Sequence, residues 1–284
     1  MSALAIRPMS RADLDRALDW AAAEGWNPGL SDAEPFLAAD PHGFLMGWLG
    51  DEPVACISVV AYGDAYGFLG FYICRPEFRG KGHGRAIWQA GMARLGERTI
   101  GLDGVVEQQA RYAKSGFALA HRNIRFGGTA STHETADLRI VELQPSRPTG
   151  LAGSIVAYDR ALQPGPREAF LRAWLMPPGR RTLALVEANS ICGYGCVRQC
   201  REGYKVGPLF ADTPEIAERL FASLTGRLYG APIFLDVPEP NGEAVALAER
   251  HGLKPVFETA RMYRGPAPTL PLDRTFGITT FELG

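Results

Sequence analysis

The chain has 284 residues, of which 46% are hydrophobic and 21% are charged, and its formal net charge is −1. This composition is typical of a globular protein with a buried core, and the length suffices for two domains. The near-neutral charge argues against a strongly basic surface, and therefore against nucleic acid as the main partner. Five cysteines, with no signal peptide and no long apolar run, predict a reduced, cytoplasmic protein with no membrane partner.

The N-terminal part predicts a strand and two helices. A strand is expected over residues 3–9, and Ser10 is placed to cap the helix that follows. Residues 24–29 form a run of helix breakers that ends this helix. Ser31 and Glu34 have the spacing of a capping box, which predicts a second, short helix.

The following segments predict a meander and then alternating helices and strands. Apolar runs separated by turn residues indicate the strands, and apolar residues on one face indicate the helices. The expected strands are 44–49, 54–60, 65–74, 99–103 and 117–126, and the expected helices are 85–95 and 107–115.

The most informative stretch is the glycine-rich loop (residues 79–84), Arg79-Gly80-Lys81-Gly82-His83-Gly84, which Arg85 follows. It joins an apolar strand to a helix. Glycine lets the backbone turn tightly and lets a ligand approach it. A helix N-terminus directs several N–H groups and the positive end of its dipole to one spot. The loop therefore predicts an anion site, most simply for a diphosphate; a glycine-rich turn without a ligand is the alternative.

Two common phosphate motifs do not fit this loop. The P-loop needs Gly-Lys-Ser/Thr, and the dinucleotide fingerprint needs a different glycine spacing. Instead, the strand, loop and helix resemble the GNAT acetyltransferase superfamily. The resemblance implies that residues 79–85 bind the pyrophosphate of an acyl-CoA, with acetyl-CoA as co-substrate. It also implies that Tyr72, Ile73 and Cys74 bind the pantetheine arm through a splayed strand.

The second part of the chain repeats the first. Residues 243–261 align without gaps on residues 107–125, and Asp236 corresponds to Asp103. We interpret this as an internal duplication. The expected fold class is α/β (α+β), with two GNAT-like domains, each a mixed, mostly antiparallel sheet flanked by helices. The expected domains are residues 1–132, which are catalytic, and residues 137–284, which are degenerate.

The expected join and the last strand complete this division. The join falls within residues 127–136, where Gly, Thr, Ser and His crowd together, and residues 277–283 predict a final strand.

The second copy lacks the features of a diphosphate site. Asp212 and Glu215 place carboxylates at its helix N-terminus, and Pro214 has no N–H to donate. The copy is therefore expected to be blocked by its own side chains, with one acyl-CoA bound per chain.

Candidate catalytic residues follow from the resemblance. Acetyl transfer needs a neutral amine, a donor for the oxyanion and a proton for the departing thiolate. Tyr112 matches the family's general acid; the alternative is a tyrosine that only packs on the core. The oxyanion donor would be a backbone N–H near Ile73 or Cys74. The strand before the loop lacks the glutamate that many relatives use as a base, so Glu24 is the candidate.

The environment of Glu24 leaves alternatives open. Glu24 could be a solvated acid or one that only binds the amine. Trp26 and Asn27 lie in the same loop and could shape the acceptor pocket, although Trp26 could equally be a core residue. The family's asparagine is Val105 here, and Gln108 or Gln109 could replace it.

No metal is expected. Cys192, Cys196 and Cys200 recur every fourth residue, but zinc sites favour closer pairs with further ligands nearby.

The main hypothesis is an N-acetyltransferase that moves an acetyl group from acetyl-CoA to a primary amine of a small acceptor. The alternatives are a non-catalytic acyl-CoA sensor or assembly protein, and an acetyltransferase acting on protein N-termini or lysines. The oligomeric state is not predicted.

Overall fold

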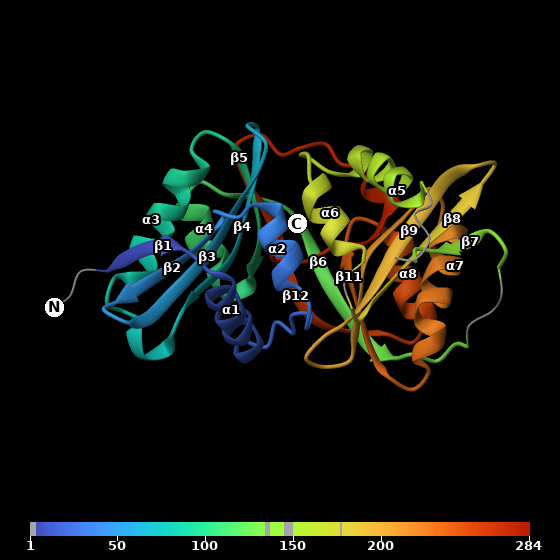
Figure 1. Cartoon of the computed structure of the whole chain (residues 1–284), viewed down its shortest axis with the longest axis horizontal. Helices are drawn as coiled ribbons and strands as arrows, with labels where there is room; N and C mark the ends of the chain where they lie inside the picture. The colour runs from blue at the N-terminus through green and yellow to red at the C-terminus, as the bar shows by residue number, and fades with distance from the viewer. Residues whose placement is uncertain (1–3, 134–136, 145–149, 177) are drawn as a thin grey trace.

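The computed structural model describes residues 4–133, 137–144, 150–176 and 178–284 (Figure 1). The first half contains, in chain order, β1 (Ala5–Pro8), α1 (Arg11–Ala23), α2 (Ala33–Ala39), β2 (Phe44–Leu49), β3 (Glu52–Tyr62), β4 (Tyr66–Cys74), α3 (His83–Leu95), β5 (Thr99–Val105), α4 (Gln109–Lys114) and β6 (Ala118–Thr129). The second half repeats this order as β7 (Ile140–Glu142), α5 (Leu151–Asp159), α6 (Glu168–Trp174), β8 (Arg180–Glu187), β9 (Ser190–Gln199), β10 (Tyr204–Ala211), α7 (Pro214–Thr225), β11 (Pro232–Pro238), α8 (Gly242–Arg250) and β12 (Lys254–Arg264), and then adds β13 (Thr275–Gly277).

The described strands form one continuous sheet that crosses both halves. Its order is β1-β2-β3-β4-β5-β12-β6-β11-β10-β9-β8-β7, and β13 pairs with β10. Among these strands only β4–β5 and β10–β11 pair in parallel; the other pairs are antiparallel. The expectation of a mixed, mostly antiparallel α/β fold is confirmed, and the sheets of the two halves are joined.

The halves are joined by a strand exchange between β6 and β12. β12, from the second half, pairs with β5, and β6, from the first half, pairs with β11. The two exchanged strands also pair with each other over most of their length. The predicted division at residues 132 and 137 is therefore a division of the sequence, whereas each half of the sheet includes a strand from the other. Residues 134–136 of the predicted join lie outside the described residues.

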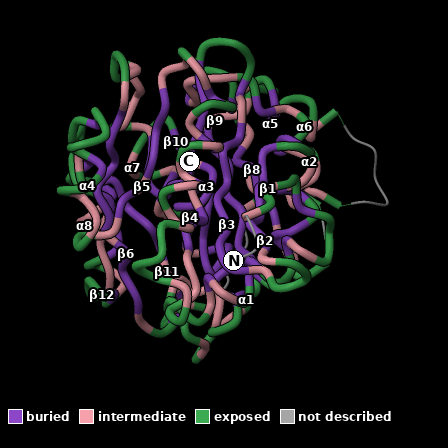
Figure 2. The backbone as a smooth tube through the Cα atoms, turned by 90° about the vertical axis from the view of Figure 1, so that its left-hand side faces the viewer, coloured by how far each residue is buried: buried purple, intermediate pink, exposed green. Residues whose placement is uncertain are grey.

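Helices cover both faces of the sheet in each half. In the first half α1 and α2 pack on one face, and α3 and α4 pack on the other. The second half repeats this arrangement with α5 and α6 opposite α7 and α8. α2 packs against α6, so the two halves also meet through helices (Figure 1). Figure 2 shows the buried strands enclosed by elements with exposed outer surfaces.

The structure confirms one predicted helix cap and corrects another. Ser10 caps α1, as predicted, and Asp13 completes a reciprocal capping box that the sequence analysis did not include. The capping box predicted for Ser31 and Glu34 is wrong, because the N-cap of α2 is Asp32 and the Ser31 hydroxyl donates to the carbonyl of Pro178.

The predicted strand over residues 277–283 is also wrong. β13 ends at Gly277, and the following C-terminal tail (residues 278–284) is irregular, because it leaves β10 and crosses to the first half. The C-terminus lies between the two halves (Figure 1). None of the described helices combines the length and apolar character that crossing a membrane requires.

Candidate active site

A bulge in β4 opens the sheet at its centre. Cys56 lies opposite Ile73 and Ser58 lies opposite Gly70, so two residues of β4 face a single residue of β3. Phe71, one of the two, has a φ of 46°, in the left-handed region. The parallel pairing of β4 with β5 ends at Leu69. Beyond that point the two strands separate, and backbone groups on the facing edge of β4 no longer bond to β5.

A cavity of about 610 Å³ occupies this gap. At one end it is lined by the glycine-rich loop and the start of α3, with Arg79, Gly82 and Arg85 among its residues. Elsewhere it is lined by Trp26 and by residues of the second half. The volume is within the range of roughly 300–1,000 Å³ that is usual for small-molecule sites.

The loop end of the cavity has backbone N–H groups that the helix itself does not use. Gly82 is the N-cap of α3 with a φ of 87°, and Gly80 has a φ of 76°, which a residue with a Cβ rarely adopts. The first bond of the helix runs from the N–H of Ala86 to the carbonyl of Gly82 at 3.0 Å. The N–H groups of residues 83–85 therefore have no acceptor inside the helix. This arrangement favours an anion.

Arg79 and Glu24 meet at the edge of this end. The guanidinium Nε of Arg79 donates to the carbonyl of Cys74 at 2.8 Å, and its Nη2 donates to Oε1 of Glu24 at 2.6 Å. Glu24 lies at the C-cap of α1, so the end of that helix is joined to the glycine-rich loop. The sequence-based candidate base is therefore an ion-pair partner of a loop arginine.

Three predicted residues do not line the cavity. Lys81 donates through Nζ to the carbonyl of Glu77 at 2.9 Å, and the ring of His83 lies edge-on to Phe78. The side-chain amide of Asn27 forms two hydrogen bonds, both 2.9 Å, with the backbone of Glu202 in the second half. Asn27 thus joins the loop after α1 to the turn between β9 and β10.

Tyr112 lines the cavity from α4. It is 8% exposed, and its ring stacks on Trp88 with centroids 5.6 Å apart. Gly104 permits this position, since a Cβ there would lie 2.8 Å from the tyrosine ring. Burial, and to a lesser extent Tyr72, raise the pKa of Tyr112. Its hydroxyl has no hydrogen-bond partner within the described part of the chain, and it stays protonated near neutral pH.

The remaining predicted residues on β4 also line the gap. Tyr72, Ile73 and Cys74 are all part of the cavity wall. Burial raises the pKa of the Cys74 thiol, so this cysteine is protonated rather than a thiolate nucleophile. Of the two glutamines considered as replacements for the family's asparagine, Gln108 lines the cavity.

Sequence reasoning missed the part of the wall that the second half supplies. Phe257 and Thr259 come from β12, and Phe281 and Glu282 come from the C-terminal tail. The rings of Phe257 and Phe281 are 6.1 Å apart, and the guanidinium of Arg125 lies over both. No sequence motif marks these residues, because the strand exchange and the path of the tail bring them to the first half.

The corresponding gap in the second half is filled by the chain itself. β13 pairs with β10 beyond the point where β10 leaves β11, at Leu209 and Phe210. Asp212, at the position that corresponds to the loop, accepts hydrogen bonds from Tyr158 at 2.8 Å and from Arg274 at 2.5 Å. Asp212 therefore helps to fill the second site, as predicted, and β13 and Arg274 fill the rest of it.

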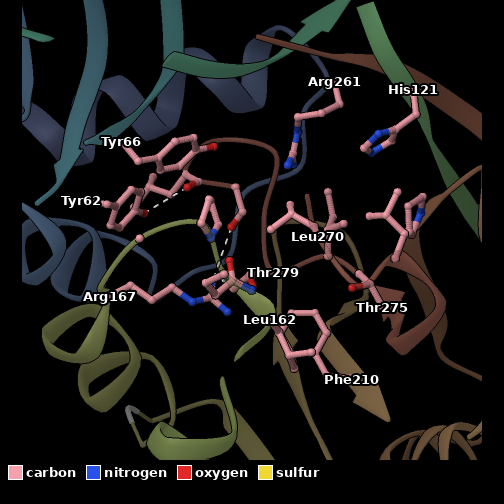
Figure 3. Close-up of a pocket in the computed structure, with 18 residues that line it drawn as sticks. Tyr62, Tyr66, His121, Leu162, Arg167, Phe210, Arg261, Leu270, Thr275 and Thr279 are labelled. Atoms are coloured by element: carbon pink, nitrogen blue, oxygen red, sulfur yellow. Dashed lines mark hydrogen bonds between the residues drawn. The ribbon is translucent and has the colours of Figure 1, made fainter. Parts of the chain in front are cut away.

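A second hollow, of about 40 Å³, lies beside the C-terminal tail (Figure 3). It has room for only a few water molecules. Tyr62 donates there to the carbonyl of Leu283 at 3.0 Å, and Arg167 donates to Thr279 at 2.9 Å, as the dashed lines show (Figure 3). The hydrogen bonds beside this hollow anchor the tail, and the hollow is too small for a metabolite.

The splayed parallel pair, the glycine-rich helix N-terminus beside it and the buried tyrosine are the features of an acyl-CoA-dependent transferase of the GNAT class. Within the described ranges, no three His, Cys, Asp or Glu side chains are grouped to hold a metal ion.

Comparisons with known proteins agree with this class. The sequence model described as "Acetyltransferase (GNAT) family" matches residues 11–117, and "Acetyltransferase (GNAT) domain" matches residues 155–277. The chain is 30% identical over 279 residues to holothin acyltransferase of Pseudoalteromonas sp. (strain SANK 73390), covering 98% of this chain and 94% of that protein. The chain belongs to the GNAT family in its tandem form, and it is an acyl-CoA-dependent N-acyltransferase.

Solved structures share the whole fold. A putative acetyltransferase from Pyrococcus horikoshii has a TM-score of 0.82 and 22% identity, covering 100% of this chain and 97% of that chain. A tandem GNAT protein from the clavulanic acid biosynthesis pathway has a TM-score of 0.64 and 15% identity, covering 94% of this chain and 100% of that chain. The non-catalytic sensor considered from the sequence finds no support in the match to holothin acyltransferase.

Proposed function

We propose that the protein transfers an acetyl group from acetyl-CoA directly to a primary amine of a small acceptor in the cytoplasm. The observation that supports this is a cavity whose lining differs in chemistry from one part to another. Backbone donors and arginines line one end, and aromatic residues and Glu282 from the other half line another part. Such a cavity brings two ligands of different chemistry together in the gap between β4 and β5.

In this proposal the loop holds the coenzyme and β4 positions its thioester. The N–H groups of residues 83–85 and the guanidinium groups of Arg79 and Arg85 bind the pyrophosphate. The freed backbone of Tyr72 to Cys74 binds the pantetheine arm, and an N–H near Ile73 or Cys74 donates to the oxyanion.

Tyr112 is the proposed general acid. As the amine nitrogen bonds to the carbonyl carbon, the carbon–sulfur bond breaks and the thiolate takes the proton of the tyrosine hydroxyl. The raised pKa keeps that proton in place until the thiolate forms. The hydroxyl has no competing partner among the described residues, which leaves it available to the sulfur.

The acceptor is proposed to be a small amine with an apolar or ring-containing body. Trp26, Phe257 and Phe281 supply aromatic surface. Residues of both halves line the cavity, and we take this shared lining to favour a small molecule over a protein N-terminus or lysine. The relative at 30% identity acts, by its name, on holothin, a further reason to place the acceptor among small molecules.

The proposal is tested by measuring thiol release from acetyl-CoA with a panel of amines. The panel contains aniline, 2-phenylethylamine, tyramine, spermidine and a lysine peptide, and longer acyl-CoA donors are compared with the best amine. We expect turnover with ring-bearing amines to exceed turnover with the peptide. Thiol release no faster than hydrolysis with every amine would contradict the proposed function, and faster turnover of the peptide would contradict the acceptor class.

A further inference from the structure

Glu282 is a buried carboxylate in the wall of the cavity. The residue is 4% exposed. Its Oε2 accepts a hydrogen bond from the Thr280 hydroxyl, and its Oε1 has no hydrogen-bond partner in the part of the chain that the structure describes. Buried carboxylates are normally paired with a cation or fully hydrogen-bonded, so an unpaired oxygen at a cavity wall needs an explanation.

The charged groups near Glu282 are engaged with other partners. Arg125 forms a bidentate pair with Asp236, and Lys205 donates to the carbonyl of Asn27 at 3.0 Å. Arg198 donates through Nη1 to the carbonyl of Thr279 at 3.4 Å, and its Nε lies 3.3 Å from Oδ1 of Asp32, whereas its Nη2 has no hydrogen-bond partner among the described residues. Burial outweighs the attraction of Lys205, Arg198 and Arg125, and with Asp32 it raises the pKa of Glu282.

The other carboxylates of the cavity are neutralised. Glu24 pairs with Arg79 at 2.6 Å. Asp103 pairs with Arg261 through two hydrogen bonds of 2.8 Å and accepts a third from Asn123. Among the described acids that line the cavity, Glu282 is the one without a cation bound to it.

The tail holds Glu282 at a fixed position against the bulged strand. The carbonyl of Glu282 accepts from the Ser58 hydroxyl at 3.4 Å. A Cβ at Gly70 would lie 2.3 Å from that carbonyl oxygen, so a glycine is needed for the tail to pass. Tyr62 fixes the next residue, as Figure 3 shows. The second half thus supplies the acid that β4 lacks.

We propose, on the basis of the proposed function, that Glu282 is the general base of the transfer. Its free Oε1 takes the proton from the acceptor nitrogen as the nitrogen–carbon bond forms and the carbon–sulfur bond breaks. The thiolate takes its proton from Tyr112, so one proton is accepted and one is donated in each turnover. A carboxylate in a buried site is a stronger base than one in water, which suits this task.

The test compares Glu282→Gln with Glu24→Gln and with Glu97→Gln, a matched change at an exposed residue outside the cavity. Acetylation of 2-phenylethylamine is followed from pH 5 to 9, acetyl-CoA affinity by calorimetry and stability by Tm. We expect Glu282→Gln to lower kcat/KM by about 100-fold or more, with acetyl-CoA affinity within about threefold of wild type. When kcat/KM is calculated for the neutral form of the amine, the wild-type fall at acid pH should be absent in this variant.

Stability separates a base from a structural acid. Because burial raises the pKa of Glu282, its ionised form opposes folding, and this cost grows as pH rises from the unfolded pKa to the folded pKa. Glu282→Gln should therefore raise the Tm at pH 8 and change it little at pH 4.5. A structural carboxylate would instead give a lower Tm at pH 8.

Three results would overturn the inference. One is a kcat/KM of Glu282→Gln within about threefold of wild type. The second is a large loss of kcat in Glu24→Gln with none in Glu282→Gln, which would make Glu24 the base. The third is a wild-type kcat/KM, calculated for the neutral form of the amine, that does not fall at acid pH, a result that requires no folded variant. A wild-type enzyme inactive with every amine of the panel would overturn the proposed function together with this inference.

Discussion

Arg261 and Asp103 form a bidentate ion pair across β12 and β5, with Nε–Oδ1 and Nη2–Oδ2 distances of 2.8 Å. Arg125 and Asp236 repeat the pair across β6 and β11, at 2.6 and 2.8 Å. Each half therefore supplies the arginine for the aspartate of the other half. The duplicated residues meet in this crossed way because β6 and β12 are exchanged.

The Arg125–Asp236 pair predicts a large stability effect. Asp236→Asn leaves the buried guanidinium of Arg125 uncompensated, so the free energy of unfolding should fall by about 3–5 kcal/mol. Urea unfolding at pH 7 measures this change. Asp137→Asn, in a more exposed ion pair, is the control and should cost less than about 1 kcal/mol.

The same pair predicts a loss of stability in acid. Burial alone would raise the pKa of Asp236, but Arg125, Lys205 and Arg198 outweigh it and lower that pKa. The stabilisation is present above the unfolded pKa of an aspartate and is lost as pH falls through the lower folded value. Between pH 5 and pH 3 the Tm of the wild type should fall by more than the Tm of Asp236→Asn. Parallel curves of Tm against pH for the two proteins would contradict this.

Tyr112→Phe should lower kcat about 100-fold while the acetyl-CoA affinity changes little, because the variant removes the proton and keeps the stacked ring. Steady-state kinetics and calorimetry measure the two effects. Tyr229→Phe, at an exposed tyrosine of the second half, serves as the matched control. Unchanged turnover of Tyr112→Phe would exclude this hydroxyl from the reaction.

Gly82→Ala tests the glycine-rich loop. An alanine at a φ of 87° costs about 1–2 kcal/mol and would distort the start of α3. Acetyl-CoA affinity should fall by about tenfold or more. Gly230→Ala imposes the same strain at a φ of 81°, at a residue that does not line the cavity, and it should lower stability without changing affinity. Equal affinities in the two variants would mean that the loop does not hold the coenzyme.

Glu24→Gln should bind acetyl-CoA more tightly, by about two- to fivefold at low salt, because Arg79 is released from its partner and a negative charge leaves the anion site. Calorimetry at 20 and 300 mM salt measures the effect, which should shrink at the higher salt. A weaker affinity would show that Glu24 positions Arg79 for the ligand rather than competing with it.

Calorimetric titration with acetyl-CoA should give one site per chain. β13 and the Asp212–Arg274 pair fill the position that corresponds to the cavity in the second half. Arg274→Ala removes the ion pair but leaves the strand, so the count should stay at one. A count of two in wild type would contradict the expected block.

The sequence by itself determined the local features of this protein. The strand, the glycine-rich loop that follows it and the segment around Tyr112 are each continuous in the sequence. Short-range spacing was therefore enough to indicate the GNAT class. The duplication was also visible, because equivalent segments keep their order. These properties depend on backbone preference and periodicity, which neighbouring residues in the sequence determine.

Only the tertiary structure decided which residues complete the cavity. Phe257, Phe281 and Glu282 reach the first half because β12 is exchanged and the C-terminal tail crosses between the halves. Likewise, the second gap is filled by β13, which is remote in sequence from β10. Local propensity cannot predict such contacts, since pairing between distant strands depends on competition among many partners, and the folded sheet alone selects one of them.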